Sequence, residues 1–177
     1  NYTLTGRPIV YNSKTDLGYF DEVIESGALD KADLKDVRFL VNHDTSKIPL
    51  ARATEKNKNS TMIFVVDKNG MGIIVELDVE NNSEARALYS AVQRGDITGM
   101  SFMFTIDDEE WENLESEHPT RHIKSIGQVF EVSAVTFPAY EASEISARDK
   151  KSLDDAVNKA RTNDLDLLKL KAKYIYK

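Results

Sequence analysis

Short runs of β-branched and aromatic residues recur through the first three quarters of this chain, with turn residues between them. Residues 61–66 lead into Asp67-Lys68-Asn69-Gly70, and residues 72–77 then return as an apolar partner. An Asn-Gly pair between two such runs is a strong signal for a tight β-hairpin. Three more segments have strand-like composition: residues 37–43, 100–106 and 129–137. The chain is therefore constrained to a β-rich fold.

Helical signals are fewer. Asn82 supplies a capping side chain before residues 84–92, and Gly95 stands where a left-handed residue commonly ends a helix. A second, shorter helix is predicted to begin at Asp30, whose carboxylate is available as a cap. Several strands with one or two helices predict an α+β domain, β-rich and with a barrel as its candidate form.

Two segments depart from this pattern. Residues 107–117 are strongly acidic and are predicted to form a solvated loop between two strands. From residue 149 onward charged residues alternate with leucines, and Ser152 with Asp155 is predicted to form a capping pair. The chain is accordingly divided into a domain over residues 1–148 and a helical C-terminal tail over residues 149–177.

Composition excludes several classes of protein. With 177 residues the chain can bury a substantial core, and its lack of cysteine excludes disulfides, thiolate zinc sites and a cysteine nucleophile. A net charge of -7 argues against nucleic-acid binding driven by clustered cations. No apolar stretch reaches the roughly 20 residues of a membrane span, and residues 1–6 lack the features of a signal peptide. We expect neither nucleic acid nor membrane as a partner.

Three of these segments carry the residues of a nucleophilic site. His43 ends the first strand candidate, Ser101 follows a glycine-punctuated turn, and Glu131 lies in an apolar run. A serine hydroxyl attacks only when a base takes its proton, and the near-neutral pKa of histidine suits that role. A carboxylate on the far ring nitrogen orients the imidazole and stabilises its charged form. The three together predict a Ser-His-Glu triad.

Each residue alone also fits a structural role. Ser101 and His43 fit ordinary hydrogen-bonded strand residues, and Glu131 fits the exposed member of an alternating strand whose Val132 faces inward. Asp44 is an alternative third member beside His43. Because neighbouring strand residues point to opposite faces, Asp44 is poorly placed unless His43 lies in a turn.

A metal site is considered and not predicted. His118 and His122 have a spacing that suits metal binding on a helix, but Pro119 lies between them in acidic, non-helical surroundings. Arg121 and His122 are predicted to precede the next strand. We expect no metal and no organic cofactor.

Four blocks, in order, resemble the tailed-phage prohead (capsid maturation) proteases, distant relatives of the herpesvirus assemblins. They are residues 21–28, His43-Asp44 with Pro49 and Ala51-Arg52 after it, residues 95–102, and residues 131–139. The resemblance covers about residues 2–148 and departs from the family at Phe102-Met103-Phe104, where many members have small residues.

The resemblance implies a serine endopeptidase that cleaves scaffold and capsid-protein segments, and itself, inside the immature capsid in the host cytoplasm. It also implies an assemblin-like β-barrel flanked by helices, and a homo-oligomer, such as a dimer. Ser101 would be the nucleophile and His43 the general base, with Glu131 where assemblins have a second histidine. The alternative hypothesis is a non-catalytic scaffolding or capsid-binding component on the same fold.

Overall fold

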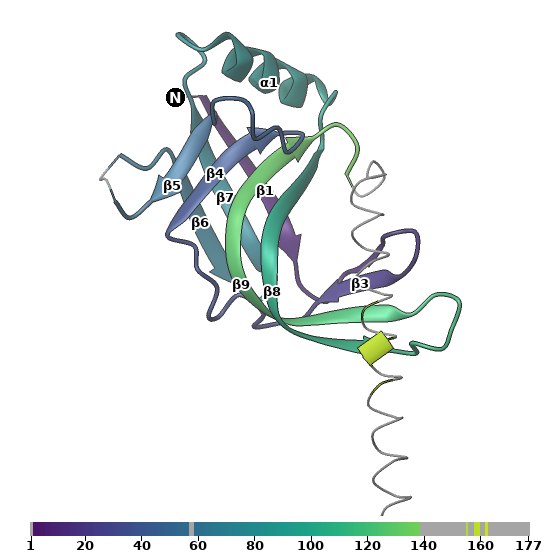
Figure 1. Cartoon of the computed structure of the whole chain (residues 1–177). Coiled ribbons are helices and arrows are strands. Elements are labelled where there is room, and N and C mark those ends of the chain that lie inside the picture. Colours follow the sequence, from purple (N-terminus) through teal and green to yellow (C-terminus); the bar gives the residue numbers. More distant parts are fainter. Residues whose placement is uncertain (1, 57–58, 139–154, 156–157, 160–161, 163–177) are drawn as a thin grey trace, which may run out of the picture.

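The structure, a computed structural model, describes residues 2–56 and 59–138, and residues 155, 158, 159 and 162 beyond them. Its smaller sheet has three antiparallel strands in the order β1-β7-β6 (Figure 1). These strands are β1 (Tyr2–Val10), β6 (Met62–Asp67) and β7 (Gly70–Leu77). Asp67 pairs with Gly70 across a two-residue loop, and Gly70 adopts a φ of 128° that favours glycine. The hairpin prediction is confirmed.

The larger sheet is built around one long strand, β9 (Thr120–Val135). Strand β8 (Gly99–Glu112) is antiparallel to β9 and pairs with it from end to end. The other edge of β9 takes two parallel partners, first β3 (Asp21–Ile24) and then β4 (Asp36–Val41). The short strands β2 (Lys14–Asp16) and β5 (Ala51–Thr54) extend the sheet beyond β3 and β4.

Both sheets contribute alternate apolar residues to one core. Helix α1 (Ser83–Arg94) lies across one end of the strands (Figure 1) and buries Ala85 and Leu88 against this core. The side chain of Asn82 accepts hydrogen bonds from the first helical N–H groups, and Gly95 ends the helix at a φ of 78°. This helix agrees with its prediction. Core residues from the sheets include Ile9, Val37, Phe39, Ile73, Val75, Val129, Val132 and Ala134.

The fold is thus β-rich α+β, with one helix within residues 2–138. Strand β1 lies beside β8, and β5 lies beside β6. Among the described residues no strand ladder joins the two sheets, although the N–H of Thr61, directly before β6, donates to the carbonyl of Arg52 in β5 at 3.0 Å. A closed barrel is therefore not assigned. None of the helical segments within this described part of the chain is long and apolar enough to cross a membrane.

The helix predicted to begin at Asp30 is wrong. Residues 26–31 form turns, with Gly27 at a φ of 86°. The Ala28 carbonyl accepts a hydrogen bond from the N–H of Ile126 at 2.8 Å, and the N–H of Asp33 donates to Gly127 at 2.7 Å. The carbonyl of Asp33 accepts from the N–H of Val129 at 3.2 Å, and β4 begins at Asp36, so the backbone that would build the first helical turn pairs with β9 instead.

The predicted acidic loop is also wrong over much of its length. Residues 107–112 lie within β8, and the connecting loop is confined to residues 113–119. Arg121 and His122, expected before the next strand, lie inside β9. Both pair with carboxylates of β8, Arg121 with Glu109 and His122 with Glu112. Arg121 and Lys124 of β9 are cations that offset the acidic charge of Glu109 and Glu110, which favours the strand conformation of these residues.

The helical tail over residues 149–177 lies outside the described residues, apart from positions 155, 158, 159 and 162, which are helical. Both the tail and the domain boundary after residue 148 therefore stay predictions.

Candidate active site

Sheet topology gathers the predicted site residues at one end of β9, which we call the proximal end of the β8–β9 hairpin. Strands β4 and β9 are parallel, so both finish there, and the antiparallel β8 begins there. Ser101 lies directly opposite Ser133, and Met103 lies directly opposite Glu131. Directly opposed residues of an antiparallel pair project from the same face of the sheet. Ser101, Ser133 and Glu131 therefore share one face.

The opposite face of the same strands is apolar. Val132 and Ala134 of β9 belong to the core, and Phe102 and Phe104 of β8 pack against it. The bulky phenylalanines after Ser101, where the chain departs from the family pattern, thus lie on the core side, while Met103 shares the face of Ser101.

Glu131 is buried even though it alternates with core residues. It is 2% exposed, so the interpretation of Glu131 as a solvated strand residue is wrong, although Val132 does face inward. Glu131 Oε1 lies 2.5 Å from His43 Nδ1, and Ser133 Oγ donates to Glu131 Oε2 at 2.5 Å. A buried carboxylate requires such partners. Ser133 is not among the predicted site residues, and the signal that could have indicated it is its two-residue spacing from Glu131 on a strand.

The turn that follows β4 carries His43 over the end of β9. Asn42 and His43 both adopt left-handed backbone conformations, with φ of 51° and 57°. The Asn42 N–H donates to the carbonyl of Ala134 at 2.9 Å. Its side-chain oxygen accepts from the Thr136 N–H at 2.9 Å, and its amide nitrogen donates to Thr136 Oγ1 at 3.2 Å. These bonds fasten the turn to β9, and the described contact of the His43 ring uses Nδ1.

Asp44 has a different role in this turn. Its Oδ1 accepts hydrogen bonds from the Ser46 hydroxyl at 2.5 Å and from the Ser46 N–H at 3.0 Å. These bonds hold the pKa of the Asp44 carboxyl below its usual range. Although His43 does lie in a turn, the hydrogen bonds of Asp44 in the described structure stabilise the turn, and the imidazole contacts Glu131 instead.

Two of the motif blocks meet next to Ser101. A Cβ atom at Gly99 would overlap the ring of Pro138, so only glycine leaves room for this proline. Gly95 ends α1 and Gly99 begins β8. The glycines of residues 95–102 therefore deliver Ser101 to the end of β9, where residues 131–139 finish.

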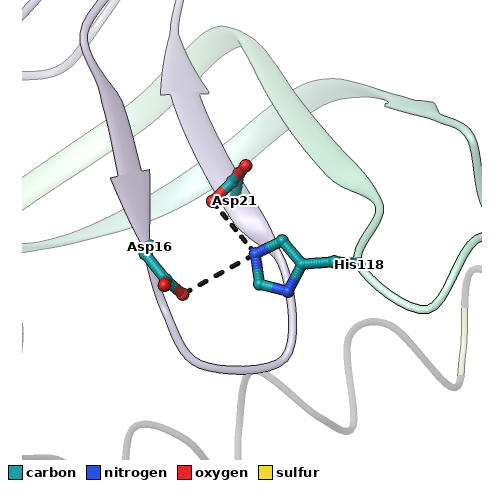
Figure 2. Close-up of side chains that lie close together, drawn as sticks. All are labelled: Asp16, Asp21 and His118. Atoms are coloured by element: carbon teal, nitrogen blue, oxygen red, sulfur yellow. Dashed lines mark hydrogen bonds and ion pairs between the residues drawn. The ribbon is translucent and has the colours of Figure 1, made fainter.

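The two histidines considered for a metal lie at the other end of the hairpin, its distal end, and contact separate groups. His118 Nε2 lies 3.0 Å from Asp21 Oδ1 and 3.7 Å from Asp16 Oδ1 (Figure 2). His122 instead contacts Glu25 and Glu112, each at 3.2 Å. The two histidines whose spacing would suit a metal therefore do not converge.

Asp16, Asp21 and His118 bring ligand atoms close together in the part of the chain that the structure describes. Lys14 Nζ already lies 3.3 Å from Asp21 Oδ2, so a metal cation would have to compete with this ammonium group for the carboxylate. Burial raises the pKa of Asp21, but hydrogen bonds from His118 and Lys14 outweigh it and leave the pKa below its usual value. The cluster is a set of paired charges.

A histidine bound to a buried carboxylate, with a serine on the same face, is the equipment of a serine hydrolase. Comparison with protein families agrees, because the family model described as caudovirus prohead serine protease matches residues 1–157. The chain belongs to this family, and it is a serine endopeptidase of phage capsid maturation. Searches of curated proteins and of solved structures find no match.

Proposed function

We propose that this endopeptidase cleaves scaffold and major capsid protein segments, and itself, with Ser101, His43 and Glu131 as its catalytic triad. The observation that carries the proposal is the 2.5 Å contact between His43 Nδ1 and the buried Glu131 carboxylate, on the sheet face that also bears Ser101. Because Nδ1 is bound to Glu131, Nε2 is the ring nitrogen of His43 that remains to take the proton of Ser101.

In the reaction, Ser101 Oγ attacks the carbonyl carbon of the scissile peptide bond while His43 Nε2 takes the hydroxyl proton. The tetrahedral intermediate collapses as the C–N bond breaks, and His43 gives that proton to the leaving amine. Water then attacks the acyl-enzyme, again with His43 as base, and releases the new carboxylate and the free serine. Glu131 keeps the imidazole in one tautomer and stabilises its cation. No step uses a metal or cofactor.

The setting we propose is the interior of the immature capsid in the host cytoplasm, with a homodimer as the active form and a barrel-like arrangement of the two sheets. The substrates are proteins of the capsid; nucleic acid and membrane are not partners. Membership in the prohead protease family supports a capsid context.

Co-expression with the major capsid protein of the same phage tests this proposal. Wild-type chain is expected to shorten the capsid protein, and mass spectrometry of the new ends identifies the cleaved bonds. Ser101→Ala is expected to fold normally and leave the capsid protein intact. Cleavage at the wild-type rate by Ser101→Ala would overturn the assigned nucleophile.

A further inference from the structure

Ser133 lies at the centre of a closed ring of hydrogen bonds. Its hydroxyl donates to Glu131 Oε2 at 2.5 Å and accepts from the His43 backbone N–H at 3.1 Å. Glu131 Oε1 completes the ring by contacting His43 Nδ1 at 2.5 Å. One hydroxyl thus connects the backbone of the histidine with the carboxylate that binds its ring.

Burial and hydrogen bonding distinguish Ser133 from Ser101. Ser133 is 0% exposed, whereas Ser101 is partly accessible. The Ser133 proton is directed at a carboxylate oxygen and its lone pair at an N–H, so both functions of the hydroxyl are engaged. Ser133 therefore cannot reach a substrate carbonyl in this arrangement, although it lies directly opposite Ser101.

The ring restrains two otherwise free motions. The Glu131 carboxylate can rotate about its terminal torsion, which is broad for sp³–sp² bonds, and the bond from Ser133 holds Oε2 so that Oε1 faces His43. His43 has a left-handed backbone at φ 57°, which favours glycine, and its N–H bond to Ser133 holds that conformation. Asn42, the residue before His43, is anchored by its hydrogen bonds to Thr136, and these bonds do not involve the carboxylate.

We propose that Ser133 is a positioning residue of the protease, which sets the orientation of Glu131 and His43 together. This inference rests on the proposed triad. Loss of the hydroxyl then weakens the chemical step, because the base is no longer held in one geometry, while substrate binding is unchanged. A residue that only filled space would respond to volume, whereas a positioning hydroxyl responds to hydrogen-bonding capacity.

Two substitutions separate these roles in the full chain. Ser133→Cys keeps nearly the same volume with a much poorer hydrogen-bonding group, and Ser133→Thr keeps the hydroxyl while adding a methyl group. The substrate is a synthetic peptide that spans a bond mapped in the co-expression experiment. We expect kcat of Ser133→Cys to fall about 10- to 100-fold with unchanged KM, the range known for outer partners of metal-binding histidines. Ser133→Thr is expected to recover most of kcat.

Controls make failure informative. Ser125→Cys, on the same strand but near the distal end, is expected to keep wild-type kcat, and thermal unfolding reports whether each variant is folded. Wild-type kcat in Ser133→Cys, or a lower kcat in Ser133→Thr than in Ser133→Cys, overturns the positioning role. If Ser133→Cys fails to fold, the Thr variant decides: wild-type KM with most of kcat supports the role, and collapse of kcat contradicts it. Cleavage by Ser101→Ala would instead overturn the triad itself, so the two failures are distinguishable.

Discussion

The β8–β9 hairpin places carboxylates at both of its ends but satisfies them in different ways. At the proximal end a single buried carboxylate, Glu131, is bound by an imidazole and a neutral hydroxyl. At the distal end, which reaches away from the body of the molecule beside β3 (Figure 1), full cations bind Glu22 and Glu110, and other carboxylates contact His118 and His122. There Arg121 is buried against Glu22 and lies over the rings of Phe20 and Trp111.

From this difference we expect the proximal end to contribute chemistry and the distal end to contribute stability. A carboxylate paired with an arginine is neutralised permanently, because the guanidinium does not release its proton. A carboxylate paired with an imidazole is bound to a group that exchanges protons near neutral pH. The distal end also has imidazoles against carboxylates, His118 with Asp21 and His122 with Glu112. At the proximal end, however, the imidazole meets a buried carboxylate on the sheet face that also carries Ser101, so we expect chemistry there and a charged support at the distal end.

Replacing one histidine at each end by alanine gives the largest expected contrast in cleavage rate. His43→Ala is expected to reduce cleavage about 10⁶-fold, as in other serine proteases that lose their base. His122→Ala, at the distal end, is expected to cleave at the wild-type rate because its contacts are with Glu25 and Glu112. Cleavage of the capsid protein, followed by gel and mass spectrometry, measures both. Equal losses in the two variants would contradict a division of labour between the ends.

The carboxylates give the next largest contrast. Glu131→Gln keeps the shape of the side chain but removes the charge that stabilises the imidazolium, and a fall of up to about 10⁴-fold in kcat is expected. Glu110→Gln removes an exposed distal partner of Lys124 and is expected to leave kcat unchanged.

Asp44→Asn tests the remaining candidate for the third member. Since Asp44 binds Ser46, whereas the His43 ring binds Glu131, kcat of the Asp44→Asn variant is expected to stay close to the wild-type value. An inactive Asp44→Asn together with an active Glu131→Gln would reassign the third member of the triad.

The stability of the fold, unlike the activity of the enzyme, is expected to depend on the distal end. Arg121→Met leaves Glu22 without its cation in a largely buried position, which is expected to lower the free energy of unfolding by about 3 kcal/mol. Activity of the folded fraction should persist. Arg7→Met, which breaks an exposed pair with Asp67, is expected to have a clearly smaller effect. Urea unfolding measures both, and a stable but inactive Arg121→Met would show that the distal end takes part in catalysis.

The smallest effect is a pH dependence at the distal end. A hydrogen bond from Lys124 lowers the pKa of Glu110. Because the folded pKa is depressed, the stabilisation is present above the usual glutamate pKa of about 4.3 and is lost as pH falls through the lower folded value. The unfolding midpoints of wild type and Glu110→Gln should therefore differ at pH 7 and converge in acid. A difference that grows in acid would have the wrong sign.

Local signals predicted the elements with strong turn or cap residues. Asn69-Gly70 marked the β6–β7 hairpin, and Asn82 with Gly95 marked α1. The Asp30 helix failed because its backbone binds β9, a partner distant in sequence. The prediction of an acidic loop failed for the same reason, since Arg121 and Lys124 across the hairpin offset charges that repel one another along β8.

The candidate site shows the same limit. Residue chemistry was sufficient to select His43, Ser101 and Glu131, and the two-residue period of a strand was available to select Ser133. What the sequence could not supply was the register that sets Ser101 opposite Ser133 and the turn that returns His43 to Glu131. Register and turns of this kind depend on contacts between separate strands, which a local pattern does not encode.

The central claim is that the proximal end of the hairpin is the active site, with Ser101 as its nucleophile. Labelling with a fluorophosphonate in proheads assembled by co-expression tests it most directly, with the modified residue identified by peptide mass spectrometry. We predict modification at Ser101 in the wild-type chain and none in His43→Ala. Modification of another serine, or equal labelling of the His43→Ala variant, would contradict the account.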